Sequence, residues 1–161
     1  MIAKHISLAV FLALIVLVAA IGAAFEAGLW YFDMNKPGWA PPAWAYGPIW
    51  AVTYVLAALA AWQVWETGHQ RRRGALAWWG IVLALQLIWM ALFFGLHRIG
   101  WAWAEMGLLI GVTLLCIRAF HGASKQAAYL MLPFLAWTLY AWVLNLVIWS
   151  VNGGLLGRFA A

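Results

Sequence analysis

The chain has 161 residues, of which 68% are hydrophobic and 8% are charged, and its formal net charge is +5. Ordinary soluble domains contain roughly 45–50% apolar residues, so this composition excludes that class and indicates an integral membrane protein. A helix needs about 20 residues to cross the bilayer core, and apolar runs of that length fill most of the chain. We therefore expect an all-α membrane protein with a single domain over residues 1–161.

The apolar runs predict a bundle of five transmembrane helices. In chain order, the expected spans are residues 6–25, 46–65, 75–96, 101–119 and 129–151. The first run has an alternative interpretation as a cleaved secretory signal, because Lys4 precedes it and small residues follow it. A signal core has roughly 7 to 15 apolar residues, whereas this run is as long as a full span, so its length favours a membrane helix.

Cationic residues are unevenly divided between the two ends of the predicted bundle. Five spans place the N-terminus on the same side as the second and fourth connections. That side carries most of the basic residues, namely Lys4, Arg71, Arg72, Arg73, Arg118 and Lys125. The positive-inside rule therefore predicts a cytoplasmic N-terminus in a plasma-type membrane. The arginine run has acidic lipid headgroups as possible contacts, and no nucleic acid is needed as a partner to explain the charge.

The first connection, from Trp30 to Trp50, has an unusual composition, with the sequence WYFDMNKPGWAPPAWAYGPIW. Tryptophan rings bury a large area, and leaving them in water is costly. The prolines fix backbone angles and remove hydrogen-bond donors, which favours an ordered segment over a flexible loop. We expect this connection to form an aromatic cap over a pocket.

The same connection resembles a known family pattern, WYxxLxKPxWxPPxWxFxPxW, found in the translocator protein or tryptophan-rich sensory protein family, TspO/MBR. Met34 and Tyr46 stand where that pattern has Leu and Phe. Two further patterns, NxxWxxxFFG and PxxxWxxxxxxLN, resemble the residues Gln86, Trp89, Phe93, Phe94, Gly95, Pro133, Trp137, Leu144 and Asn145. The resemblance covers all five spans in order. It implies a bundle of tilted helices, commonly a homodimer, and points to a bacterial member in a bacterial membrane.

Two departures from the family pattern bear on ligand binding. Gln86 stands where the family usually has an asparagine whose amide looks into the ligand pocket, so the longer side chain displaces that contact. Leu146 and Ser150 stand where mammalian members have a tyrosine and a basic residue of a sterol-recognition pattern. This second departure speaks against high-affinity sterol handling by that motif.

Counting depth at 1.5 Å per residue places aromatic, amide and small side chains of four helices under the cap. That combination is typical of a site for a flat, mostly apolar ligand. The expected ligand-binding residues are Ala23, Trp39, Trp50, Tyr54, Gln86, Trp89, Phe93, Trp137, Ala141 and Asn145. Hydrogen bonding between helices is the alternative role for Gln86 and Asn145. The resemblance points most strongly to Trp50 and Trp137.

Two cations, Lys36 and Arg98, are closest in sequence to the expected entrance. As charge-assisted partners they suit the carboxylates of a porphyrin, while contact with lipid phosphate is the competing role. The sequence predicts no metal site and no required cofactor. His97 is by itself a weak candidate for ligating a haem iron.

The resemblance implies a receptor or transporter-like membrane protein that binds porphyrins, with protoporphyrin IX or haem as ligand. Sterols and benzodiazepine-type drugs are related planar ligands, and the expected process is tetrapyrrole transport or stress sensing. One alternative is a porphyrin-degrading enzyme with Trp50 and Trp137 as electron relays. The sequence offers no nucleophile with a base and no carboxylate pair, so no catalytic residue is assigned and the enzyme is the less favoured interpretation. A ligand-modulated membrane scaffold is the third.

Overall fold

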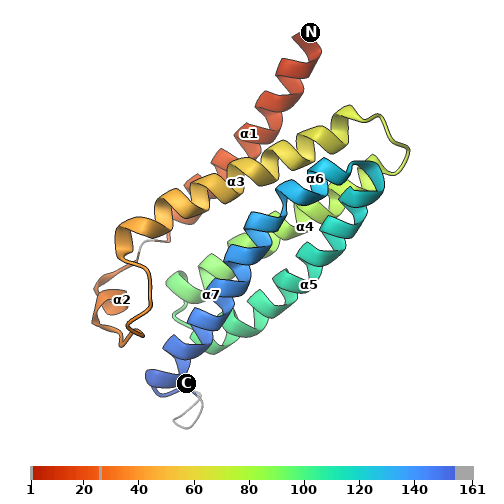
Figure 1. Cartoon of the computed structure of the whole chain (residues 1–161). Coiled ribbons are helices and arrows are strands. Elements are labelled where there is room, and N and C mark those ends of the chain that lie inside the picture. Colours follow the sequence, from red (N-terminus) through yellow and green to blue (C-terminus); the bar gives the residue numbers. More distant parts are fainter. Residues whose placement is uncertain (1, 26, 155–161) are drawn as a thin grey trace.

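The computed structural model describes residues 2–25 and 27–154. Its long helices are α1 (Ile2–Ala23), α3 (Ala43–Glu66), α4 (Arg72–Met90), α5 (Ile99–Ala123) and α7 (Leu132–Val151). Three shorter elements complete the described chain, namely α2 (Leu29–Asp33), the π-helix η1 (Ala91–Gly95) that continues α4, and α6 (Lys125–Leu130) that leads into α7. Figure 1 shows the long helices as one elongated bundle, with α2 at the end where α7 finishes. The described residues contain no strand, and the all-α prediction is confirmed.

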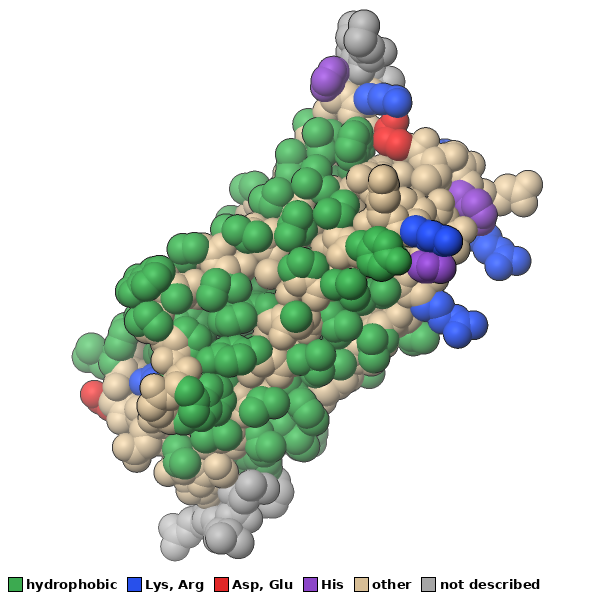
Figure 2. Space-filling model, in the orientation of Figure 1, with side chains coloured by type: hydrophobic (Ala, Val, Ile, Leu, Met, Phe, Trp, Pro, Cys, Tyr) green, Lys and Arg blue, Asp and Glu red, His purple; other side chains and the backbone are tan. Residues whose placement is uncertain are grey.

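Within residues 2–25 and 27–154, five helical segments are long and apolar enough to cross a membrane. They are Lys4–Ala23, Ala43–Glu66, Arg72–Gly95, Ile99–Ala123 and Lys125–Val151. Hydrophobic side chains cover the middle of the molecule, while Lys, Arg and His side chains gather at one end (Figure 2). The protein is therefore a multi-pass membrane protein with five candidate spans.

The predicted and observed spans differ most around Ser124. The sequence predicts a connection over residues 120–128, but the structure reduces it to Ser124 alone, between α5 and α6. The Ser124 hydroxyl accepts a hydrogen bond from the Ala127 backbone N–H at 3.2 Å and so caps the next helix. Phe120, Ala127 and Ala128 are buried against the core. Tertiary packing and one cap thus extend both helices beyond their most apolar stretches.

The first helix is fixed to the bundle at both of its ends. Near the basic end, the Trp62 indole donates to the Ser7 hydroxyl at 3.1 Å, and that hydroxyl lies 2.8 Å from the Glu66 carboxylate. At the opposite end, Gly22 is buried so closely against the Met90 thioether that a Cβ there would lie 2.9 Å from the Met90 Cε. The close approach of α1 to α4 positions the C-terminal end of α1 beside the site described next.

A cavity beneath an aromatic lid

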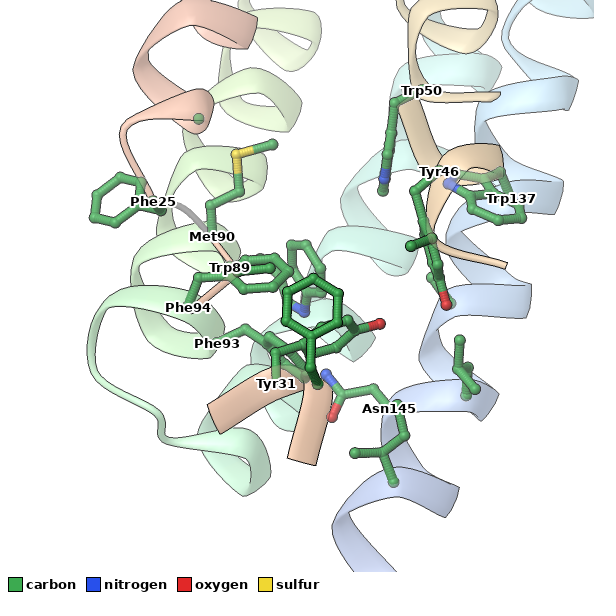
Figure 3. A pocket seen from close by; sticks show the side chains of 17 residues that line it. Phe25, Tyr31, Tyr46, Trp50, Trp89, Met90, Phe93, Phe94, Trp137 and Asn145 are labelled. Carbon is green, nitrogen blue, oxygen red and sulfur yellow. The ribbon is translucent and has the colours of Figure 1, made fainter. Parts of the chain in front are cut away.

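A cavity of about 330 Å³ lies inside the end of the bundle that α2 covers. Six of the residues expected to bind a ligand line it: Trp50, Trp89, Phe93, Trp137, Ala141 and Asn145. Figure 3 shows how side chains from α3, α4, η1 and α7 surround this space. The structure therefore brings these six residues together although they are up to 95 positions apart in the chain, from Trp50 to Asn145.

Three tryptophans form the inner end of this cavity, which we call the floor (Trp50, Trp89 and Trp137). The Trp50 ring centroid lies 6.0 Å from that of Trp137 with an interplanar angle of 83°, and 6.5 Å from that of Trp89. The Trp89 ring stacks on Phe93 at 5.3 Å and 26°. These distances suit favourable aromatic pairs, so the floor is an ordered surface of ring faces and edges contributed by three helices.

The segment over the cavity, residues 28–42, is here called the lid. Lys36 folds back on α2, and its ammonium donates to the carbonyl oxygens of Tyr31, Met34 at 3.2 Å and Phe32 at 3.4 Å. The same nitrogen lies 4.5 Å from the centroid of the Tyr31 ring. A cation at the C-terminal end of a helix satisfies its free carbonyl groups. Lys36 thus holds α2 together, and it is not among the residues that line the cavity.

One edge of the lid packs against η1 through aromatic rings. The Trp30 ring lies 4.1 Å from the His97 ring and 5.8 Å from Phe93, measured between centroids. The Tyr31 ring lies 5.7 Å from Phe94. This edge is therefore a cluster of large apolar contacts.

The other edge of the lid is held to α7 by hydrogen bonds. Asn152 accepts from the Asn35 backbone N–H at 3.0 Å and donates from its amide to the Asn35 carbonyl oxygen at 2.9 Å. The Tyr140 hydroxyl donates to the Trp39 carbonyl oxygen at 3.1 Å. The lid therefore bridges η1 and α7 across the mouth of the cavity, which confirms the expected ordered cap.

The π-helix η1 shapes the wall below the aromatic edge. Its widened turn is closed by the Leu96 N–H, which donates to the Ala91 carbonyl oxygen at 2.8 Å. Both Phe93 and Phe94, adjacent in sequence, line the cavity. Single π-turns are frequent at functional sites, and here the turn lets two neighbouring rings serve one wall.

Asn145 has two roles in the structure. It lines the cavity. Its amide oxygen also accepts a hydrogen bond from the Trp89 indole, and its amide nitrogen donates one to the Ile99 carbonyl oxygen, each at 3.2 Å. The orientation of the amide follows from this hydrogen-bond network. Asn145 therefore joins α7 to α4 and α5 while forming part of the wall.

Two further polar groups of the cavity wall have no hydrogen-bond partner in the described part of the chain. They are the Trp137 indole N–H and the Tyr46 hydroxyl, both buried, and the Tyr46 hydroxyl has the Tyr31 side chain as its polar neighbour. Each side chain lines the cavity. A ligand that offers an acceptor atom to these two donors would satisfy groups that otherwise remain unpaired.

Four of the expected ligand-binding residues do not line the cavity. Ala23 is exposed beside Gly22, and Trp39, 49% exposed, packs on Tyr140 outside the lid edge. Tyr54 and Gln86 are buried one helical turn deeper than Trp50 and Trp89. Arg98 is exposed at the start of α5 and also lies outside the lining. Ligand contact by these residues stays a prediction.

Sequence reasoning missed several lining residues: Phe25, Ala27, Tyr31, Phe32, Ala43, Tyr46, Met90, Phe94, Leu144 and Ile148. Tyr31, Tyr46, Phe94 and Leu144 occupy positions of the family patterns, and this was the signal available for them. The residues that the structure describes include no group of three or more His, Cys, Asp or Glu side chains placed to hold a metal ion.

Comparison with known proteins identifies the family. The chain matches the TspO/MBR family over residues 9–150. It is 33% identical to the translocator protein of Bos taurus over 138 residues, which cover 82% of each chain. It is 33% identical to the Homo sapiens translocator protein over 131 residues, 80% of this chain and 78% of that one. It is 30% identical to the tryptophan-rich protein TspO of Chlorobaculum tepidum over 152 residues, 91% of this chain and 96% of that one. The chain belongs to the TspO/MBR family.

Proposed function

We propose that the protein binds planar, mostly apolar ligands in the cavity beneath the lid, and that porphyrins such as protoporphyrin IX or haem are the principal class. Sterols and benzodiazepine-type molecules are related candidates. The observation that carries this proposal is the cavity itself. Its walls are tryptophan, tyrosine and phenylalanine rings contributed by the lid and by α3, α4, η1 and α7. Such a lining favours burial and stacking of a flat aromatic surface.

The polar groups of the cavity suit an acceptor on the ligand. Among the described residues the Trp137 indole N–H is an unpaired donor, and the Tyr46 hydroxyl has the Tyr31 side chain as its polar neighbour, whereas the Asn145 amide is already engaged with Trp89 and Ile99. A carbonyl, carboxylate or ring nitrogen of the ligand would therefore gain the most binding free energy if it lay beside Tyr46 and Trp137. A net gain of about 0.5–1.5 kcal/mol for each such bond is typical.

The size of the cavity bears on how a porphyrin would enter. Ligand pockets have volumes of about 300–1,000 Å³, and this cavity, at about 330 Å³, lies near the lower limit. A tetrapyrrole macrocycle is larger than most drug-sized ligands, so its binding requires the lid to move outward. The hydrogen bonds at the α7 edge are exposed and are the contacts most easily exchanged for water.

The names of the relatives support a role in transport or sensing. They include translocator proteins and a tryptophan-rich sensory protein of Cereibacter sphaeroides, 32% identical over 134 residues. We extend these roles to the present chain, as a receptor or transporter for tetrapyrroles in a bacterial membrane, acting as a homodimer.

A second candidate function is oxidative breakdown of a bound porphyrin. It is favoured by one observation, the 6.0 Å separation of the Trp50 and Trp137 rings at the floor of the cavity. Both rings would then serve as electron relays. Loss of porphyrin absorbance in the presence of the protein, compared in darkness and in light, separates this enzyme from a binding protein.

The proposal is tested by titrating the detergent-purified protein with protoporphyrin IX in dim light while following the quenching of tryptophan fluorescence. We expect saturable binding that is weakened by Trp137→Phe, which replaces the indole with a smaller ring and removes its N–H donor. Trp103→Phe is the matched control, because Trp103 stacks on Trp142 and is not among the lining residues. Quenching that does not saturate, or that weakens equally in both variants, would overturn the proposal.

A further inference from the structure

The lid follows α7 into the part of the molecule that is apolar enough to span a membrane. The Asn35 backbone bonds to Asn152, directly after the end of α7, whereas the Trp39 carbonyl oxygen accepts a hydrogen bond from the Tyr140 hydroxyl. Tyr140 precedes Asn152 by twelve residues, which corresponds to about 18 Å along a helix axis at 1.5 Å per residue. Tyr140 also lies well inside the candidate span Lys125–Val151. Residues 35–39 of the lid therefore run beside a candidate membrane helix.

The outer face of α2 carries large apolar side chains. Leu29 is 82% exposed, and Phe32, which also borders the cavity, is 60% exposed. Residues three positions apart share a helix face, so these two side chains form one apolar surface. Between them in the chain, Trp30 and Tyr31 pack inward against η1. An exposed apolar surface of this kind marks a contact with a partner molecule or with a membrane.

Two exposed tryptophans lie at the same end of the bundle as the lid. Trp44 is 76% exposed in the first turn of α3, and Trp101 is 67% exposed in the first turn of α5. Both helices begin at the end of the bundle where α2 lies (Figure 1), and tryptophan is enriched where membrane and water meet. Figure 2 shows hydrophobic side chains that reach this end, while Lys, Arg and His side chains gather at the opposite one. The apolar surface of the spans thus continues onto the lid.

Side chains bond the backbone of the lid. Lys36 donates to three carbonyl oxygens in and after α2. Asn152 pairs with both backbone groups of Asn35, and Tyr140 donates to the Trp39 carbonyl oxygen. A loop in water has no need of such partners, because water itself bonds free backbone groups. Where water is scarce, backbone polar groups need partners within the protein, so these bonds suit a segment that contacts lipid.

The charged side chains of the lid leave the apolar surface of Leu29 and Phe32 uninterrupted. Within residues 28–42 the sequence has two charged residues, Asp33 and Lys36. The Lys36 ammonium is folded back onto carbonyl oxygens. Asp33 is exposed and lies two residues before Asn35, which is bonded at the end of α7. A carboxylate near the end of a spanning helix is close to the polar headgroup region.

We infer that the outer face of the lid is a lipid-contact surface, with phospholipid of the surrounding leaflet as its partner. Acyl chains cover Leu29 and Phe32, and headgroups lie beside Asp33. The partner follows from continuity, because the exposed apolar face of α2 joins the lipid-facing surface of α3 through Trp44. One consequence rests on the proposed function: the mouth of the cavity borders the phase into which apolar ligands partition.

Spin labelling in phosphatidylcholine vesicles tests this inference without any ligand, so its outcome is separate from that of the proposed function. Cys116, the single cysteine of the chain, is replaced by alanine. A nitroxide is then attached at Leu29→Cys or, as a second site on the same face, at Phe32→Cys. The measured quantity is the ratio of nitroxide collisions with oxygen, which concentrates in lipid, to collisions with a water-soluble nickel chelate.

Two exposed positions outside the lid supply the reference values. Val16→Cys lies in the candidate span Lys4–Ala23 and reports lipid, whereas Gln70→Cys lies between α3 and α4 and reports water. We expect the ratio at Leu29 and Phe32 to be several-fold higher than at Gln70 and close to that at Val16. Melting temperatures near that of the wild type show that the labelled variants are folded. Ratios at both lid positions that match Gln70 would overturn the inference.

Discussion

Asn35 in the lid and Asn152 just after α7 bond to each other in both directions, although 117 positions separate them. The Asn152 side chain pairs with both backbone groups of Asn35, as a neighbouring strand would. It also donates to the Ile148 carbonyl oxygen of its own helix at 2.7 Å. One side chain thus finishes α7 and fastens the lid to it.

Removing this fastening should speed ligand exchange. Asn152→Ala deletes both bonds to the lid, and because both are exposed their combined loss is worth about 1 kcal/mol. We expect association and dissociation rates for protoporphyrin IX to rise by about fivefold, with a smaller change in affinity. Stopped-flow quenching of tryptophan fluorescence measures both rates. Ser150→Ala is the control, since the Ser150 hydroxyl bonds within α7, to the Val147 carbonyl oxygen. Equal rates in the wild type and Asn152→Ala would show that the α7 edge does not limit opening.

Lys36→Met should weaken ligand binding by unravelling α2. The substitution keeps an apolar stem but removes the ammonium that binds three carbonyl oxygens of the lid. Tyr31 and Phe32, which line the cavity, then lose their fixed positions. Faster amide hydrogen exchange across the lid would report this change directly.

The same variant separates helix capping from recognition of carboxylates by Lys36. Titration with protoporphyrin IX and with its dimethyl ester compares ligands that differ in charge. If Lys36 acts through α2, Lys36→Met lowers the affinity for both ligands by the same factor. A loss confined to the free acid would instead show that Lys36 contacts the carboxylates.

Asn145→Leu should destabilise the bundle. It removes the amide that links the Trp89 indole to the Ile99 carbonyl oxygen and leaves both of these groups unpaired. Interhelical hydrogen bonds in membranes contribute about 0.6 to 1.7 kcal/mol, and we expect a loss in that range. Equilibrium unfolding in detergent measures it. Thr138→Val is the control, because the Thr138 hydroxyl bonds to the Phe134 carbonyl oxygen of its own helix. Equal stability of the wild type and Asn145→Leu would argue against the link.

The sequence predicted the five spans well because long apolar runs leave few alternatives in a bilayer. At the fourth connection the helices extend further than the predicted spans, since the cap at Ser124 and the burial of Phe120 are tertiary effects that hydropathy does not record. The π-turn at η1 also has no marker in the residues Ala91 to Gly95.

On the faces of α3, α4 and α7, where helical spacing fixes direction, residues expected to bind a ligand line the cavity. Trp50, Trp89 and Trp137 share the cavity for this reason. Depth was harder to judge, so Tyr54 and Gln86 were expected in the cavity and lie behind its floor. The role of Lys36 depends on how the lid folds back on itself, which spacing along the chain does not determine.

Enlarging Ala141 should obstruct the cavity. Ala141 lines it from α7, next to the floor ring Trp137. Ala141→Phe fills part of a volume of only about 330 Å³, so we expect the affinity for protoporphyrin IX to fall at least tenfold with little change in melting temperature. Ala136→Phe, on an exposed position of the same helix, is the control. Unchanged affinity in Ala141→Phe would place the ligand elsewhere.

The central claim is that the cavity beneath the lid is the ligand site, and a crystal structure with bound protoporphyrin IX tests it most directly. We predict density for the macrocycle against Trp50, Trp89 and Trp137, with the lid displaced at its α7 edge and a polar atom of the ligand beside Tyr46. Density for the porphyrin on the lipid-facing surface, with the cavity closed and unchanged, would contradict the account.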